Sequence, residues 1–362
     1  MPGLFGRELS KSSLQEYSSD IAQFASVRRA TLREGFAEGV DVIDFRTGSG
    51  FEFSVLPGRA LDLGAAYYKG IPLYWRASPG QVHAAYFEPE DMGWMRGYAG
   101  GLMTTGGLST MGSPSQDDGE TLGIHGRISY APASNVWTDA DWDGDRYRLW
   151  ARGKVTETAA LGTHLVMSRE ISTELGASSL TLRDTVENRS YHTVPHMMLY
   201  HFNVGYPILS EHSRLLLNAE ETLGRDEVSN QGLDRWDRFD PPAVGRAHQL
   251  YYHRLQADSE GLAHIALVSI QAGEPIAVYI SYSHETLPWF INWKCLQSGD
   301  YVTGLEPANA WVEGRAAERE AGRLRFLGPW ERVSYTLEFG VLAGEAAIEA
   351  FTARHNLPDY RG

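Results

Sequence analysis

Several residue types that mark particular protein classes are scarce in this sequence. Cysteine occurs once, as Cys295 in the apolar segment INWKCL, so no intrachain disulfide can form. We interpret Cys295 as a small buried hydrophobe rather than a nucleophile. Lys and Arg total 32 against 46 Asp and Glu, a formal net charge of -14. Because no basic surplus exists to displace counterions, nucleic acid and anionic membranes are not expected partners.

Long apolar runs are also missing. No stretch approaches the roughly 18 consecutive apolar residues that a membrane-spanning helix needs. The first residues, MPGLFGRELSKSSLQEY, contain neither the apolar core nor the cleavage site of a signal peptide. We therefore expect no membrane partner and a cytoplasmic location.

Helical periodicity is scarce, whereas strand and turn signals are frequent. The best helix candidates are short and lie near the two ends, at 18–26 and 344–356. The 38 glycines, 18 tyrosines and 10 tryptophans suit short strands joined by tight turns. Residues 40–59 (VDVIDFRTGSGFEFSVLPGR) and 65–75 (AAYYKGIPLYW) each contain two apolar runs around a turn, and this pattern predicts hairpins. Further alternating runs lie at 147–158, 164–175, 178–188, 193–205, 264–271, 275–283 and 333–342.

Residues 88–123 form a long glycine-rich, aromatic stretch that we interpret as too irregular for strands and as functional. The sequence shows no internal repeat, low-complexity tract or linker. These patterns predict a mainly β fold: one large antiparallel β-sandwich over residues 1–362, with short helical segments near both ends.

The segment YVTGLEPANAW, residues 301–311, directs attention to one carboxylate. In an extended strand Val302, Gly304 and Glu306 share a face, and Pro307 forces Glu306 itself into extended geometry. Because proline does not continue a central strand, we expect the strand to end at Pro307. Glu306 would then be its last residue, with a side chain held in a fixed direction on one face.

Three further segments contain polar residues in unusual places. His125 in LGIHGRIS is flanked by Gly123 and Gly126, and His201 in MMLYHFNVG shares a strand face with Asn203. Two imidazoles and a carboxylate can supply an acid and a base near neutrality.

Arg59 follows a Pro-Gly turn, in the segment SVLPGRALDLG. The fixed donor fork of an arginine can hold sugar hydroxyls. Taken one at a time, each of these four candidates fits a structural role at least as well as a catalytic or substrate-binding role. Only their joint occurrence indicates a catalytic site.

The segments HFNVG, GLEPANAW, LGIHGRIS and GRALDLG resemble the galactose mutarotase (aldose 1-epimerase) superfamily, especially its bacterial branch known as domain of unknown function 4432. The resemblance covers about residues 30 to 342 and implies a galactose mutarotase-like supersandwich. It further implies His201 as general acid, Glu306 as general base, His125 beside the ring or anomeric oxygen, and Arg59 as a substrate-orienting residue. No cofactor or metal is implied.

The sequence departs from the family pattern at two places. The family has a sugar-binding aspartate between the second histidine and the glutamate, and here Asp240, Asp258 and His253 are the candidates in that interval. The family's HGGxxG is reduced to HGRIS at His125. Because of these two departures, the sequence does not identify the sugar. The predicted general acid and general base are unaffected.

Other residues near these segments are candidate substrate ligands. Four of them lie in these segments or on a strand leading into the site, and they are Asp62, Asn203, Lys294 and Asn309. Two more, His83 and Glu120, lie in or near the glycine-rich stretch. Asp62 is expected to orient Arg59. Trp75 and Trp293 could stack on a sugar, although burial in the core suits each of them better.

The leading hypothesis is an isomerase that interconverts the anomers of a free sugar or sugar derivative. One alternative is an epimerase, isomerase or lyase acting on a keto sugar with the same acid and base; another is a carbohydrate-binding protein without turnover. A metal-dependent isomerase with His83, His125, His201 and Glu306 as ligands ranks lowest, because the usual close His-x-His spacing is missing. A small sugar is the expected partner, and a homodimer is left open.

Overall fold

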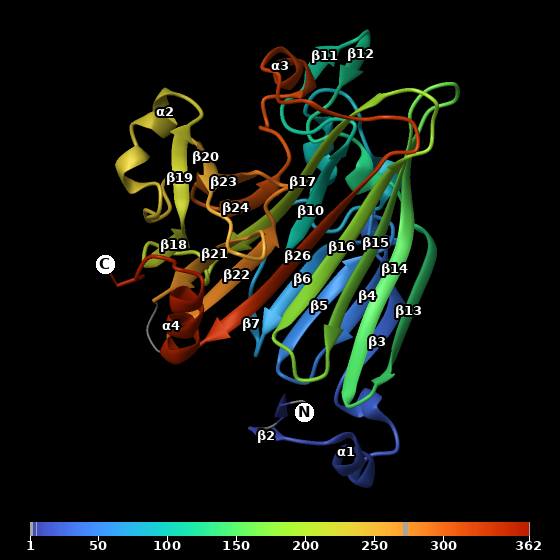
Figure 1. Ribbon diagram of the computed structural model, residues 1–362, viewed down its shortest axis with the longest axis vertical. Helices are drawn as coiled ribbons and strands as arrows, with labels where there is room; N and C mark the ends of the chain where they lie inside the picture. Colours follow the sequence, from blue (N-terminus) through green and yellow to red (C-terminus); the bar gives the residue numbers. More distant parts are fainter. Residues whose placement is uncertain (1–2, 5, 271–273, 362) are drawn as a thin grey trace.

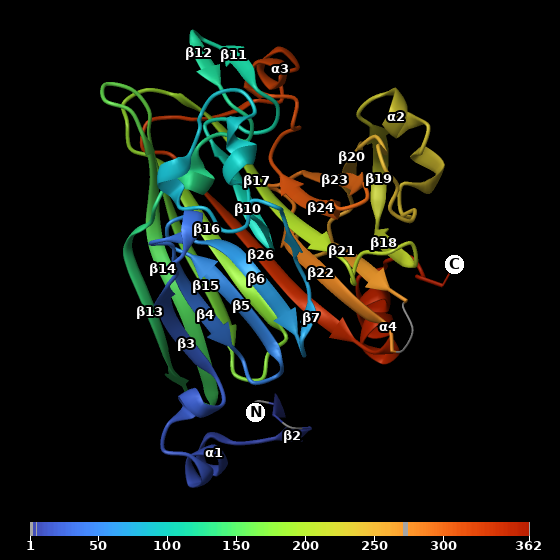
Figure 2. The same cartoon turned by 180° about the vertical axis from the view of Figure 1, so that it is seen from behind.

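The structure is a computed structural model that describes residues 3–4, 6–270 and 274–361. It contains 48% strand and 13% helix, and two large sheets pack face to face (Figures 1 and 2). The strands of both sheets pair antiparallel with their neighbours. The predicted antiparallel β-sandwich is confirmed.

The larger sheet has 12 strands, and β7 and β25 join it beside β6 and β17. In spatial order its main path is β19 (Ala219–Gly224), β20 (Gln249–Leu255), β23 (Trp289–Leu296), β24 (Tyr301–Ala308), β17 (Val194–Gly205), β10 (Met103–Leu108), β6 (Asp62–Tyr68), β5 (Phe51–Leu56), β4 (Asp41–Arg46) and β3 (Ser26–Thr31), with β7 at Ile71–Pro72 and β25 at Arg325–Leu327.

The second sheet has eight strands. Its order is β13 (Ser134–Asp143), β14 (Arg146–Thr158), β15 (His164–Glu174), β16 (Ser179–Asn188), β26 (Arg332–Ala343), β22 (Ile276–Ser283), β21 (Leu262–Ser269) and β18 (Ser213–Leu217). Three short pairs lie outside both sheets: β1 (Gly3–Leu4) with β2 (Arg7–Glu8), β8 (Trp75–Arg76) with β9 (Gly100–Gly101), and β11 (Ser115–Asp117) with β12 (Glu120–Leu122).

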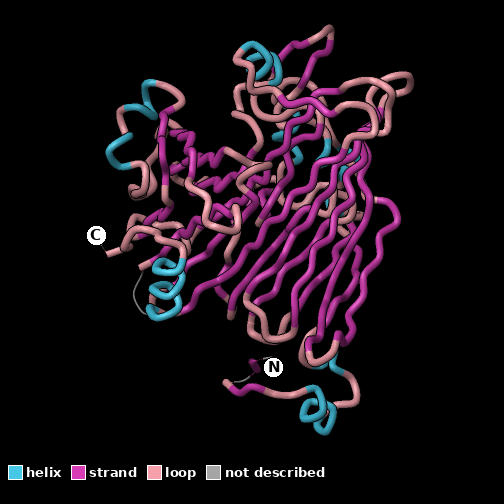
Figure 3. The backbone as a smooth tube through the Cα atoms, in the orientation of Figure 1, coloured by secondary structure: helices cyan, strands magenta, loops and turns pink. Residues whose placement is uncertain are grey.

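Helices are short and peripheral (Figure 3). They are α1 (Lys11–Tyr17), α2 (Glu227–Asn230), α3 (Arg315–Glu320) and α4 (Glu345–Arg354). The predicted C-terminal helix is therefore confirmed. The N-terminal prediction at 18–26 is wrong, because only a 3-10 turn forms there, at Ile21–Gln23, while the helix precedes it and is capped by Ser10. No helix in the described part of the chain is long and apolar enough to cross a membrane.

The hairpin predictions hold, and one loop prediction fails. β4 pairs with β5, and β6 pairs with β7 across Lys69 and Gly70. The stretch 88–123, expected to lack strands, contains the central strand β10. Its sequence MTTGGL has too few apolar residues to indicate a strand, but glycine is required at Gly107, where φ is 144° and a Cβ would lie 2.7 Å from Met197 O on the adjoining strand β17.

The main hydrophobic core lies between the two sheets and draws side chains from both, such as Phe202 of β17 and Phe339 of β26, which stack at 5.5 Å. A strand with one solvated face alternates between buried and exposed residues, as β14 does. By contrast β17 and β24 are buried on both faces. On their outer face, Met197, Leu199 and Ala308 pack with Met111, Val312 and Leu324 from loops, and this covered face contains the candidate site.

Candidate active site

His201 and Glu306 stand opposite each other on adjacent strands of the larger sheet. The antiparallel register of β17 and β24 pairs Phe202 with Leu305 and Asn203 with Gly304, so His201 is opposite Glu306. His201 Nε2 lies 3.2 Å from Glu306 Oε1. The atoms are in contact but not aligned as a hydrogen bond, since Glu306 Oε1 has no hydrogen-bond partner among the described residues.

Pro307 explains why the ladder is open at this point. The strand does not end there as predicted, because β24 continues to Ala308 and Pro307 pairs with Phe290 on β23. On the other side, the pairing with β17 skips Glu306 and Pro307, where proline offers no N–H. Asn309 restores the connection, since its Oδ1 accepts from Met198 N at 2.8 Å and its backbone N donates to Met198 O. Asn309 therefore has a structural role, joining β24 to β17.

His125 reaches the same place from a loop after β12. Its backbone is left-handed, with φ at 56°, and Gly126 follows with φ at 76°. A Cβ on Gly126 would lie 2.5 Å from the carbonyl oxygens of Gly107 and Thr110, so only glycine allows this close approach. The His125 ring stands perpendicular to the His201 ring, with centroids 5.7 Å apart.

The two histidines and the glutamate line one cavity of about 300 Å³. The remainder of its lining is largely apolar and consists of Met92, Trp94, Met95, Tyr98, Gly112, Ser113, Pro114, Ile124, Arg225, His248, Leu250, Trp293 and Val312. His125 Nδ1, His201 Nδ1 and Glu306 Oε1 are all buried without a hydrogen-bond partner among the described residues. Buried polar atoms are normally paired, so three in one cavity indicate a ligand site.

Burial favours the neutral form of all three groups. It lowers the pKa of His201 to about 3, with further repulsion from His125, and lowers the pKa of His125 to about 4. It raises the pKa of Glu306 well above its usual range. Although the His125 ring is partly exposed toward the cavity, its Nδ1 is buried. Burial therefore opposes both the imidazolium form of His201 and the carboxylate form of Glu306 in the ligand-free protein.

Asn203 holds neighbouring segments of the site in place through hydrogen bonds. Tyr98 Oη donates to Asn203 Oδ1 at 2.6 Å, and Asn203 Nδ2 donates to Gly101 O and His201 O. Asn203 does not line the cavity. It connects β17 with the segment that places Tyr98 in the cavity wall.

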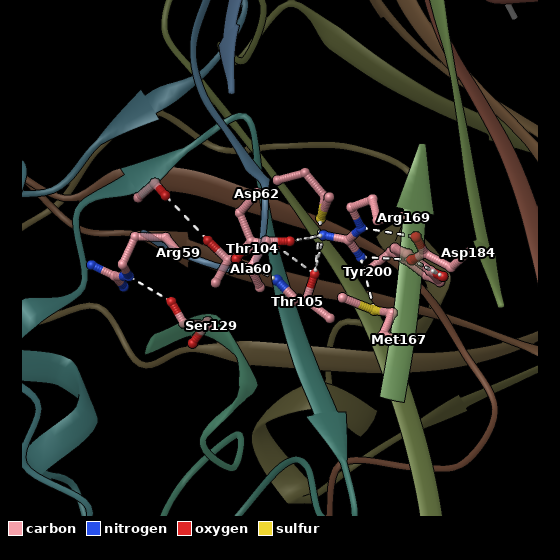
Figure 4. A network of polar contacts seen from close by, with 12 residues as sticks. Arg59, Ala60, Asp62, Thr104, Thr105, Ser129, Met167, Arg169, Asp184 and Tyr200 are labelled. Carbon is pink, nitrogen blue, oxygen red and sulfur yellow. Dashed lines mark hydrogen bonds and ion pairs between the residues drawn. The ribbon is translucent and has the colours of Figure 1, made fainter. Parts of the chain in front are cut away.

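Arg59 does not line the cavity, and that part of the prediction is wrong. Its guanidinium is buried and its Nε donates to Ser129 O at 2.5 Å (Figure 4). Its Nη1 donates to Val82 O and to Gly97 O, both at 3.2 Å. It also packs on the Tyr130 ring, 3.8 Å from the centroid. Through these three carbonyl oxygens Arg59 links the segments around the site.

Asp62 does not orient Arg59 as predicted. Its Oδ1 accepts from Arg169 Nη1 at 2.9 Å and from Thr105 Oγ1 at 2.6 Å (Figure 4). Arg169 in turn binds both carboxylate oxygens of Asp184, at 2.9 and 2.6 Å. Asp62 therefore belongs to a network between the two sheets.

Lys294 and His83 also lie outside the cavity lining. Lys294 alternates with Trp293 on β23 and so faces the opposite side of the sheet, where its Nζ donates to Arg238 O at 2.8 Å. Burial lowers its pKa to about 7. His83 Nδ1 accepts from Ala85 N at 3.1 Å and caps a short 3-10 helix. His83 therefore does not join the other proposed metal ligands.

The remaining candidates have other partners and do not line the cavity. Asp240 pairs with Arg235 and Arg246, Asp258 with His264, and Glu120 with Arg315, while His253 Nδ1 lies 2.9 Å from Thr222 Oγ1. No counterpart of the family's sugar-binding aspartate is found among these three interval residues. Of the two tryptophans, Trp293 lines the cavity and Trp75 does not.

Sequence reasoning missed several lining residues. Trp94 and Tyr98 fall in the glycine-rich stretch, whose aromatic content was the available signal. Arg225 and His248 lie in segments without any signal. His248 Nδ1 accepts from Trp293 Nε1 at 3.4 Å, and burial lowers the pKa of His248.

A family model matches residues 37–341, and the chain belongs to that family, described as Domain of unknown function (DUF4432). No curated protein gives a significant sequence match.

Solved structures share the fold. A Klebsiella pneumoniae protein provisionally named an aldose 1-epimerase superposes with a TM-score of 0.86 at 24% identity, over 92% of this chain and 87% of that one. A galactose mutarotase-like protein from Clostridium acetobutylicum gives 0.60 at 15% identity, over 88% and 99%. Galactose 1-epimerase from Lactobacillus acidophilus gives 0.56 at 12% identity, over 89% and 100%. The fold is that of the galactose mutarotase-like sandwich.

Proposed function

We propose that this protein is an isomerase that interconverts the α and β anomers of a free monosaccharide or sugar derivative, without a cofactor. The observation that carries the proposal is the contact of 3.2 Å between His201 Nε2 and Glu306 Oε1 within a cavity that also takes in His125. A cavity of about 300 Å³ is at the small end of ligand sites and suits one sugar ring.

The chemistry requires one proton acceptor and one proton donor, and we assign these roles to Glu306 and His201. Glu306 takes the proton of the anomeric hydroxyl while His201 protonates the ring oxygen. The bond between C1 and the ring oxygen breaks as the C1 carbonyl forms. After rotation about C1–C2, the ring closes on the other face and both proton transfers reverse.

Burial opposes the charges that these roles require. It raises the pKa of Glu306 and lowers the pKa of His201, so the carboxylate and the imidazolium are each disfavoured in the empty site. The assignment of Glu306 as base and His201 as acid requires both charged forms at once, and at 3.2 Å these two charges attract each other. The charged pair has the same net charge as the neutral pair, so its formation leaves the charge of the cavity unchanged.

His125 has a supporting role in this proposal. A neutral imidazole has one donor and one acceptor nitrogen, and its buried Nδ1 lacks a partner among the described residues. Its ring lies 5.7 Å from that of His201. We assign it the hydrogen bond to the ring or anomeric oxygen that holds the sugar during opening.

The test is magnetisation-exchange NMR over a panel of aldoses and ketoses in deuterated water. We expect anomer exchange above the buffer rate for at least one sugar, without deuterium at carbon and unchanged by a chelator. Deuterium at carbon would replace the proposal with keto-sugar chemistry, and binding without exchange would favour a carbohydrate-binding protein. Loss of exchange on chelation would favour a metal-dependent isomerase.

A further inference from the structure

Two separate hydrophobic clusters contribute side chains to the cavity. Leu250, Val312 and Trp293 belong to one of them, and we call these three residues the Leu250 wall. Trp94 and Tyr98 belong to the other cluster. Two methionines and a proline of the lining add further apolar surface. Away from the two histidines and the glutamate of the proposed reaction, a ligand therefore meets mainly apolar groups.

The donor groups of the aromatic lining residues are already used within the protein. Trp94 Nε1 donates to a serine hydroxyl at 2.9 Å, and Tyr98 Oη donates to an amide oxygen at 2.6 Å. Trp293 Nε1 donates to His248 Nδ1 at 3.4 Å, while His248 Nε2 lies 3.0 Å from Gln297 Nε2. These side chains therefore offer a ligand the carbon atoms of their rings.

The two remaining polar side chains of the lining, Arg225 and Ser113, are engaged as well. Arg225 Nε lies 3.0 Å from Glu313 Oε1, and Arg225 Nη2 donates to Glu313 Oε2 at 3.1 Å, so its charge is neutralised. The Ser113 hydroxyl donates to Val312 O at 3.2 Å and accepts from Arg225 Nη2 at 3.1 Å. The Arg225 side chain is also 35% exposed, so water can bind its other N–H groups.

The unpaired polar atoms of the cavity are thus gathered at one place. In the described part of the lining, His125, His201 and Glu306 are the side chains that contain buried polar atoms without a partner. An anomeric hydroxyl and a ring oxygen placed there gain partners. A sugar hydroxyl that faces the Leu250 wall instead loses its bound water and gains none, which weakens binding by about ten-fold or more. A hydrogen atom or a methyl group in its place gains apolar contact.

We infer that the substrate is a deoxy monosaccharide, in which hydrogen or methyl replaces at least one hydroxyl group away from the anomeric centre. Its anomeric carbon and ring oxygen lie at His201 and Glu306, and its deoxygenated edge lies against Leu250 and Val312. This inference rests on the proposed function, because the proton transfers fix which end of the sugar meets the polar groups.

The experiment compares sugars that differ by a single hydroxyl group. Glucose is measured with its 3-, 4- and 6-deoxy derivatives, and galactose and mannose with their 6-deoxy derivatives, by exchange NMR and by calorimetry. Two variants, Val312→Thr and Leu250→Asn, each add a polar group to the Leu250 wall. The control Val268→Thr makes the same change as Val312→Thr in a buried cluster outside the cavity. Melting curves establish that each variant is folded.

We expect at least one deoxy sugar to bind about ten-fold tighter than its hydroxylated parent, and to exchange its anomers with a correspondingly higher kcat/KM. Val312→Thr or Leu250→Asn should lower this ratio toward one, because the added group gives the hydroxyl of the parent sugar a partner. Val268→Thr should leave the ratio unchanged. A deoxy preference that neither folded variant lowers would overturn the placement against the Leu250 wall. If neither variant folds, the sugar series on the wild type decides.

Two outcomes separate this inference from the proposed function. If every hydroxylated parent binds and exchanges as well as its deoxy derivatives, the inference is overturned while anomer exchange stands. If a deoxy sugar binds in preference to its parent and the wall variants lower that preference, but no ligand exchanges its anomers, the apolar subsite stands and the proposed function is overturned.

Discussion

Two buried polar clusters on opposite faces of the larger sheet differ in one respect. In the cluster between the sheets, every charged atom of Asp62, Arg169 and Asp184 has a partner. In the cavity on the outer face, His125 Nδ1, His201 Nδ1 and Glu306 Oε1 lack one among the described residues. Paired polar groups hold the sandwich together, whereas the unpaired ones are available to a ligand.

Strand β17 supplies both clusters from consecutive residues. Tyr200 points inward, and its hydroxyl donates to Asp184 at 2.7 Å, while His201 points outward into the cavity. This follows from the alternation of side chains along a strand. Substitutions in the two clusters should therefore separate stability from activity, even for residues adjacent in sequence.

The largest effect on stability is expected from Arg169→Met. The substitution leaves two carboxylates buried without a cation, and breaking a buried ion network in this way costs about 3–5 kcal/mol. Urea unfolding measures it. The control is Arg152→Met on the surface, where a cation–π contact with Trp137 contributes about 0.5–1 kcal/mol. A loss below 1 kcal/mol for Arg169→Met would remove the distinction between the clusters.

His201→Asn should have the converse effect. We expect the enzyme-dependent exchange rate to fall by about 10²–10⁴, the usual contribution of a general acid or base. Stability should be retained, because the buried His201 Nδ1 has no hydrogen bond to lose among the described residues. Exchange NMR and a melting curve on one sample measure both. Lost stability with retained exchange would make His201 a structural residue.

Arg59→Gln should lower stability, as substitutions in the cluster between the sheets do, rather than affect substrate binding. The resemblance to mutarotases implies the opposite, a substrate-orienting role for Arg59. Removing a donor from buried carbonyls costs about 1–3 kcal/mol, and Arg59 serves three of them. KM for the sugar should stay unchanged in the folded fraction. A higher KM with unchanged stability would return Arg59 to the substrate site.

The smallest effect concerns pH. With ordinary pKa values of 4.5 and 6.5, the pair would hold a single ionisable proton only between those limits. The lowered pKa of His201, about 3, moves the acid limit of this window down, and the raised pKa of Glu306 then sets its alkaline limit. After subtraction of the buffer rate, exchange should therefore persist below pH 4.5 and be lost as Glu306 ionises. A peak confined to pH 4.5–6.5 would indicate unshifted groups.

Much of the fold could be predicted from local pattern. The alternating run 147–158, for example, is a strand with the same alternation of burial, because one of its faces is solvated. Strand β10 escaped prediction, since its pattern MTTGGL reflects crowding by β17 rather than apolar alternation. Helix α1 escaped because its sequence contains a single buried side chain, Leu14.

The candidate site was predictable only in part. His201 and Glu306 could be found because each lies on a strand whose alternation fixes its face. The direction of the Arg59 side chain could not be predicted. The next two residues, Ala60 and Leu61, adopt left-handed backbone with φ of 56° and 59°, and neither residue type indicates this conformation. Arg225 enters the cavity through the pairing of strands distant in sequence, so nothing local marks it.

The most direct test of the central claim is anomer exchange by wild type and Glu306→Gln on the same sugar, with binding and melting measured in parallel. Gln keeps the shape but cannot accept the hydroxyl proton. The account predicts a rate loss of about 10²–10⁴ with sugar binding retained and stability equal or higher, since a buried unpaired carboxyl group is removed. Exchange close to the wild-type rate, or a loss explained by unfolding, would contradict it.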